Sequence, residues 1–107
     1  MIITTTETIA GKHIVRTLGL ARGNTIRTRH LGKDIMAVLR NVVGGEVSEY
    51  TKMMAEAREQ ALDRMVEEAE QLGANAIVAV RFMTTEMMQG AAELLAYGTA
   101  VIVEDDD

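Results

Sequence analysis

The 107-residue chain contains no cysteine, and this absence removes several classes of chemistry at once. Without a thiol there is no disulfide scaffold, no cysteine nucleophile and no thiolate ligand for a metal. Aromatic residues make up 3% of the chain although 48% of it is hydrophobic, so alanine, valine, isoleucine, leucine and methionine must fill the core. Because the lack of cysteine fits a reducing compartment, we expect a cytoplasmic protein.

Long apolar segments are also missing. No apolar run reaches about 18 residues without a charge, which predicts that no segment spans a membrane. The N-terminus has no basic stretch followed by an apolar core, so we expect no signal peptide. The length is that of one domain covering residues 1–107.

The net charge of -5 is divided unevenly along the chain. Residues 1–45 contain seven basic and two acidic residues, a balance of +5, whereas residues 46–107 contain four basic and fourteen acidic residues, a balance of -10. Such a division can mark a basic binding face. We favour the alternative that the two halves face each other, within one chain or across a subunit boundary.

The most regular pattern runs from Ser48 to Leu72 and predicts one long amphipathic helix. Apolar residues recur there at steps of three and four, while the opposite face carries mostly carboxylates. At 1.5 Å per residue this helix is about 37 Å long. Ser48 suits the N-cap, and Gly73 ends the helix. The apolar stripe consists of Val47, Tyr50, Met54, Ala57, Ala61, Met65, Ala69 and Leu72.

The remaining elements follow from alternation, periodicity and turn residues. Gly19 lies inside an alternating run and indicates a bulge or a close backbone contact. We expect an α+β fold with a β-α-β-β order, in which an antiparallel sheet packs against one long and one short helix. The predicted elements are strands over Met1–Thr6 and His13–Ala21 (continuing toward Arg27), a helix over Leu31–Val42, strands over Ala76–Met83 and Ala92–Val103, a loop over Thr84–Gly90 and an acidic tail over Glu104–Asp107.

The strand over Ala92–Val103 is apolar on both faces, apart from Glu93 and Thr99. An antiparallel sheet with one solvated face should alternate apolar and polar residues. Two helices can cover one face of a small sheet, and one chain has nothing left for the other. We therefore predict that the chain self-associates.

Several short motifs resemble the YbjQ-like family of uncharacterised proteins, and the likeness covers nearly the whole chain. The resemblance implies an α+β fold loosely like that of dodecin subunits, assembly as a pentamer, and the label of a heavy-metal-binding domain. The motifs are Val43-Gly44-Gly45, Tyr50, Ala57-Arg58, Ala61, the run from Leu72 to Val78, and Tyr97-Gly98-Thr99-Ala100-Val101.

Metal ligands are sparse in the sequence. A transition-metal site needs converging histidine, cysteine or carboxylate ligands, and the only histidines, His13 and His30, stand at no ligand spacing. Met83, Met87 and Met88 could offer soft thioethers to Cu(I). Methionine also fills cores and interfaces, and we favour that interpretation.

Arg22, Arg27 and Arg29 form a small basic cluster that could contact phosphate or another anion. The cluster has no interleaved aromatic residues for base stacking, so we do not expect nucleic-acid binding. Gly44-Gly45 is better explained as a helix stop than as a phosphate loop, because Glu46 follows it.

No nucleophile, base and orienting group recur in a catalytic pattern, so we expect neither an enzyme nor a bound cofactor. The prediction is a homo-oligomeric binding or scaffolding protein, pentameric by resemblance, that does not contact membranes. The alternative is a protein that binds a metal or small ligand at its subunit interfaces.

Overall fold

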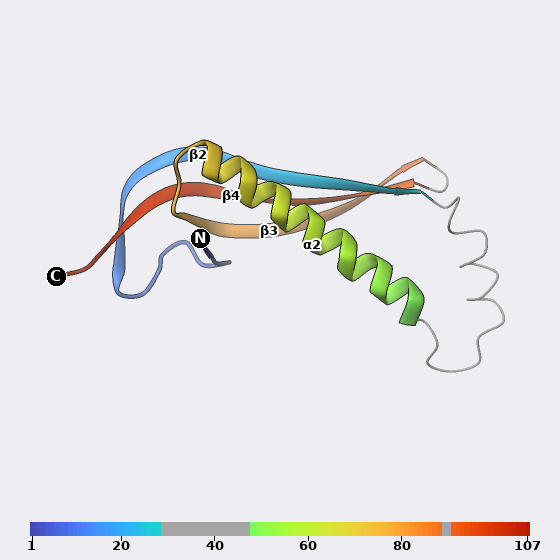
Figure 1. Ribbon diagram of the computed structural model, residues 1–107, viewed down its shortest axis with the longest axis horizontal. Coiled ribbons are helices and arrows are strands. Elements are labelled where there is room, and N and C mark those ends of the chain that lie inside the picture. Colours follow the sequence, from blue (N-terminus) through green and yellow to red (C-terminus); the bar gives the residue numbers. More distant parts are fainter. Residues whose placement is uncertain (29–47, 89–90) are drawn as a thin grey trace.

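The computed structural model describes residues 1–28, 48–88 and 91–107 (Figure 1). Within these residues the chain forms one helix and one four-stranded sheet with the order β1-β3-β4-β2. The helix packs on one face of the sheet, which confirms the α+β fold class. The elements are β1 (Ile2–Ile3), β2 (Lys12–Thr28), α2 (Ser48–Gln71), β3 (Ala76–Met88) and β4 (Ala91–Asp105). The predicted short helix over Leu31–Val42 lies outside the described residues.

The sheet is mixed, so the prediction of a wholly antiparallel sheet was wrong. β4 pairs antiparallel with both β2 and β3, whereas β1 pairs parallel with β3.

β1 is also shorter than the predicted strand over Met1–Thr6. The hydroxyl of Thr6 lies 2.7 Å from that of Thr4 and donates to the carbonyl of Thr8 at 2.6 Å, and such local side-chain bonds compete with regular strand pairing.

Both strands of the β3–β4 hairpin are longer than the sequence predicted. The predicted loop over Thr84–Gly90 was wrong for its first residues, because Thr84 pairs with Leu94 and Thr85 with Glu93 inside the ladder. Threonine is β-branched, and it favours a pleated surface even where the apolar alternation has ended.

β4 likewise runs into the predicted acidic tail. Asp105 pairs with Lys12, and Glu104 pairs with His13. The opposite charges of Lys12 and Asp105 lie directly across the ladder and form an ion pair. The strand therefore continues to Asp105, where the sequence alone indicated only a solvated tail.

The bulge predicted at Gly19 is confirmed. The register between β2 and β4 shifts between Thr17 and Gly19, and Gly19 has a φ of 123°. A residue with a Cβ rarely adopts this backbone conformation, so glycine permits the bulge.

The core between α2 and the sheet is built from small residues. Gly23 of β2 brings the two backbones together: a Cβ at this position would lie 2.2 Å from the carbonyl oxygen of Ala61 and 2.4 Å from the amide nitrogen of Met65. The helix can therefore lie directly on the strand. The fully buried residues of this layer are Ala57, Ala61, Met65 and Ala69 of α2, and Ala21, Ile77, Ala96 and Ala100 of the sheet.

The molecule is elongated. Its principal extents are 59 × 27 × 16 Å and its radius of gyration is 17.4 Å, against about 13 Å for a compact chain of this length. Its accessible surface is 7287 Å². Figure 1 shows α2 crossing the strands obliquely, with its N-terminal end projecting beyond β3. A chain of this shape exposes more surface than a compact monomer needs to.

Candidate functional site: the open face of the sheet

The two faces of the sheet differ in what covers them. On the face toward α2, the hydroxyl of Thr25 donates to the carbonyl of Ala57 at 3.3 Å in a buried environment. Because side chains alternate along a strand, the neighbours of Thr25 and their ladder partners lie on the opposite face. The N-terminal segment covers one end of that opposite face, as described below. We use the name 'open face' for the remaining, uncovered part. It consists of Leu20, Arg22, Asn24 and Ile26 of β2, Glu93, Leu95, Tyr97 and Thr99 of β4, and Arg81, Met83 and Thr85 of β3.

Large apolar side chains of the open face remain in contact with solvent. Leu20 is 56% exposed, Ile26 49% and Met83 50%. Leu95 and Tyr97 lie between them and are partly buried. One face of the sheet therefore presents exposed and partly buried apolar side chains on β2, β4 and β3, and a surface of this kind is typical of an interaction site.

The chain itself covers the other end of this side of the sheet. Backbone bonds hold Thr4 to the outer edge of β3, and the carbonyl of Gly11 accepts a bond from the amide of Asp106 beside β2. The segment between Thr4 and Gly11 therefore crosses the sheet, and Ile9 of this segment packs against buried residues of the sheet. Our expectation that one chain has nothing to cover the second face was therefore wrong at this end. The residues beneath Ile9 are Ala76, Val78, Val101 and Val103.

A row of two arginines and one tyrosine crosses the middle of the open face. Tyr97 of β4 pairs with Arg22 of β2 on one side and with Arg81 of β3 on the other. Both arginines are exposed, and their Cα atoms are about 10 Å apart, twice the spacing between strands. Nη1 of Arg81 donates to the carbonyls of Thr5 and Val80, each at 2.8 Å. These bonds use two of its five N–H donors and hold its guanidinium near the N-terminal segment that runs beside β3.

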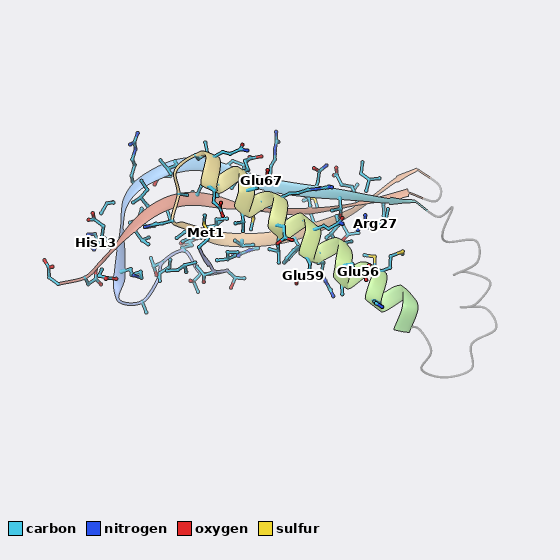
Figure 2. All side chains as sticks on the ribbon, viewed as in Figure 1. Met1, His13, Arg27, Glu56, Glu59 and Glu67 are labelled. Carbon is cyan, nitrogen blue, oxygen red and sulfur yellow. The ribbon has the colours of Figure 1, made fainter. Side chains whose placement is uncertain are left out.

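The predicted basic cluster is divided between the two faces. Arg22 lies on the open face, whereas Arg27 lies on the face toward α2 and donates to Oε1 of Gln60 at 2.8 Å (Figure 2). Arg29 lies outside the described residues. The sequence reasoning missed Arg81 as a partner of Arg22. The sequence did mark Arg81, because it is the single charged residue of the predicted strand over Ala76–Met83. Only the ladder register, however, places Arg81 and Arg22 in one row.

Carboxylates line the side of α2 that faces away from the sheet. They recur at steps of three and four, so they share one face of the helix opposite the buried alanines. Figure 2 labels three of them, Glu56, Glu59 and Glu67, along the helix. We name this set the acidic stripe. It consists of Glu56, Glu59, Asp63, Glu67 and Glu70, all of them exposed.

His13 pairs with Glu104 at one end of the β2–β4 ladder, and Ala91 lies at the other end (Figure 2). Nδ1 of His13 is 2.9 Å from Oδ1 of Asp106. Beside it, the hydrogen bond from Lys12 and then the charge of that ammonium group lower the pKa of Asp105 below its usual value of 3.8. His30 lies outside the described residues, so the structure does not bring the two histidines together.

The methionine cluster is placed only in part. Met83 is half-exposed on the open face. Met87 and Met88 belong to the end of β3, and their side chains lie outside the described part of the structure. Among the described residues, no group of three or more histidine, cysteine or acidic side chains is arranged to hold a metal ion. No helix within residues 48–88 is long and apolar enough to cross a membrane, nor is any in the other described segments.

Comparison with known proteins agrees with the resemblance seen in the sequence. A family model described as "Putative heavy-metal-binding" matches residues 1–104. A UPF0145 protein from Methanosarcina acetivorans is 68% identical over 101 residues, which cover 94% of this chain and 95% of that protein. A UPF0145 protein from Dehalococcoides mccartyi is 61% identical over 104 residues, covering 97% of this chain and 100% of that protein.

A solved structure supports the fold. The crystal structure of a protein of unknown function from Pediococcus pentosaceus, assigned to the DUF74 family, matches with a TM-score of 0.63 at 17% identity. The match covers 97% of this chain and 98% of that one. The fold, the family model and the relatives agree over nearly the whole length, and the chain belongs to the YbjQ family.

Proposed function

We propose that the protein is a homo-oligomeric binding or scaffolding protein whose subunits associate through the open face. The observation that carries this proposal is the exposure of Leu20, Ile26 and Met83. Each apolar side chain that becomes fully buried contributes roughly 1.5–3 kcal/mol relative to full exposure, so covering these half-exposed residues drives association.

The proposed assembly is a pentameric ring. The number five comes from the family resemblance, while the elongated shape and the open face support association without fixing a number. In a closed ring each subunit offers one surface and receives another, so no copy is left with an uncovered open face.

Light scattering on a sizing column at micromolar concentration tests this proposal. The expected mass is five times that of the 11.7 kDa chain. We expect Ile26→Glu to lower the mass, because it places a charge among the apolar residues of the open face. Val15→Glu is the matched control, since Val15 is 46% exposed on the same strand but outside the open face. A parent mass near 11.7 kDa would refute self-association, whereas a stable ring of another order would refute only the number.

A binding or scaffolding role accounts for this surface without a catalytic step. The names of the curated relatives identify a family and no reaction. The surface described here offers apolar contact and paired charges, which are the elements of recognition between macromolecules.

The alternative function is metal or small-ligand binding at the subunit interfaces, which the description of the matching family favours. Within one chain the described residues do not fit a heavy-metal site, because no three suitable ligands converge. Assembly would bring Met83 of the open face near a neighbouring subunit, and thioethers suit soft ions such as Cu(I). Elemental analysis of protein purified without an affinity tag tests this alternative: stoichiometric metal that Met83→Leu removes would support it, and metal-free assembled protein would refute it.

A further inference from the structure

We infer that the acidic stripe of α2 in one copy docks onto the Arg22–Tyr97–Arg81 row of the open face in the next copy, an inference that rests on the proposed self-association. It specifies which two surfaces meet. Both surfaces are present on every chain, and both are exposed in the single chain.

The charge of the open face argues against the simplest alternative, a two-fold dimer in which two open faces stack. Two sheets that pack face to face lie about 10 Å apart. Stacking would set the Arg22–Tyr97–Arg81 row of one copy near the same row of the other. Four guanidinium groups would then be desolvated together, while the only acidic residue of the open face is Glu93, which already accepts a bond from Asn24 at 3.1 Å. Like charges opposed across an interface destabilise it, so the row requires an acidic partner surface.

Two acidic surfaces are available among the described residues, and one of them is already partly engaged. At the C-terminal end, Asp105 pairs with Lys12 and Asp106 with His13 in the same chain. The acidic stripe of α2 is different, because its carboxylates point away from the sheet and are exposed along the helix. The stripe is therefore the better complement to the arginine row.

The spacing of the two surfaces also agrees. The Cα atoms of the two arginines are about 10 Å apart across three strands. Glu56 and Asp63 are seven residues apart on the helix, which is about 10.5 Å along its axis. A helix laid across the strands can thus place one carboxylate near each arginine of the row, with Tyr97 between them. The apolar residues of the open face then pack beside the helix and exclude water from these ion pairs.

Contact between two different surfaces has a geometric consequence. Head-to-tail contacts of this kind build rings or open filaments, whereas a two-fold dimer joins a surface to itself. The inferred contact is therefore the one that a closed ring needs. It also explains the division of charge along the sequence, because Arg22 lies in the basic half and the stripe lies in the acidic half.

Charge reversal in the full-length chain tests the inference. We expect Arg22→Glu with Arg81→Glu to raise the concentration at which the assembly dissociates by tenfold or more, and Glu56→Lys with Asp63→Lys to do the same. A chain that carries all four changes is expected to recover the parent mass in light scattering, because the charges are again opposite. Arg16→Glu is the matched control, since Arg16 is an exposed arginine of the same strand outside the open face.

The outcomes separate the inference from the proposed function. A monomeric parent would refute the proposed function itself. An assembled parent that Arg22→Glu with Arg81→Glu leaves unchanged or tightens would refute only the inference and would favour two stacked open faces. Recovery in the four-fold variant would also show that none of the changes prevents folding. If that variant does not fold, Arg22→Glu is combined in turn with Glu56→Lys and with Asp63→Lys, and failure of both two-change variants to recover would overturn the inference.

Discussion

Substituting Gly23 by alanine probes the closest approach between α2 and the sheet. The added Cβ would lie 2.2 Å from the carbonyl oxygen of Ala61 and 2.4 Å from the amide nitrogen of Met65, where ordinary contact requires 3.4–4 Å. Both neighbours are backbone atoms of a helix, so no side chain can rotate away, and α2 must move outward by about 1 Å. Overpacking of this kind costs about 1–3 kcal/mol. At about 4 °C per kcal/mol for a chain of this size, we expect the melting temperature to fall by roughly 4–12 °C.

The assay is thermal unfolding followed by circular dichroism at one fixed protein concentration, because self-association makes the melting temperature depend on concentration. Arg16→Ala is the control, since Arg16 is an exposed residue of the same strand that lies outside the open face. It should shift the melting temperature by less than about 2 °C, as surface substitutions do. If Gly23→Ala melted within 2 °C of the parent, the close approach of helix and strand would be refuted.

Three further predictions concern burial, protonation and metal. Ala61→Arg buries an unpaired charge at a fully buried position, which costs several kcal/mol, so we expect insoluble or largely unfolded protein; parent-like melting would show that the apolar stripe is not buried. Because Lys12 lowers the pKa of Asp105, the ion pair stabilises the folded state above pH 3.8, and this contribution is lost as the pH falls through the lowered pKa. An NMR titration of the Asp105 carboxyl group should give a midpoint below 3.8. A midpoint at or above that value would contradict the ion pair. Calorimetry with Zn²⁺ and Ni²⁺ should show no binding tighter than about micromolar, roughly -8 kcal/mol, and a nanomolar isotherm that His13→Ala or His30→Ala abolishes would prove this wrong.

Local patterns in the sequence predicted the elements well where one face is buried. The helix was expected over Ser48–Leu72 and is found over Ser48–Gln71, because small apolar residues recur with the helical period along its whole length. The bulge at Gly19 was likewise visible, since glycine interrupts an alternating run. In both cases the physical cause lies within a few residues of its effect.

The features that the sequence did not predict depend on contacts between distant segments. The row of Arg22, Tyr97 and Arg81 exists only because two ladders with shifted registers align residues that are 16 and 75 positions apart. The cover that Ile9 provides for one end of the sheet depends on the path of the N-terminal segment, which no periodicity encodes. Side-chain alternation fixes the face on which a residue lies but not its neighbours.

The pairing of the strands has a consequence for folding during synthesis. β2 pairs with β4, so that Lys12 meets Asp105, and β1 pairs with β3. Among the described strands, neither N-terminal strand has a partner nearby in the sequence. The 17-residue β2 must therefore wait, with both of its edges unpaired, until almost the entire chain has left the ribosome, while α2 and the β3–β4 hairpin can form from local contacts. Nascent chains of this protein should consequently depend on chaperones that hold exposed strands, and a stall in translation shortly before Ala91 should make them aggregate.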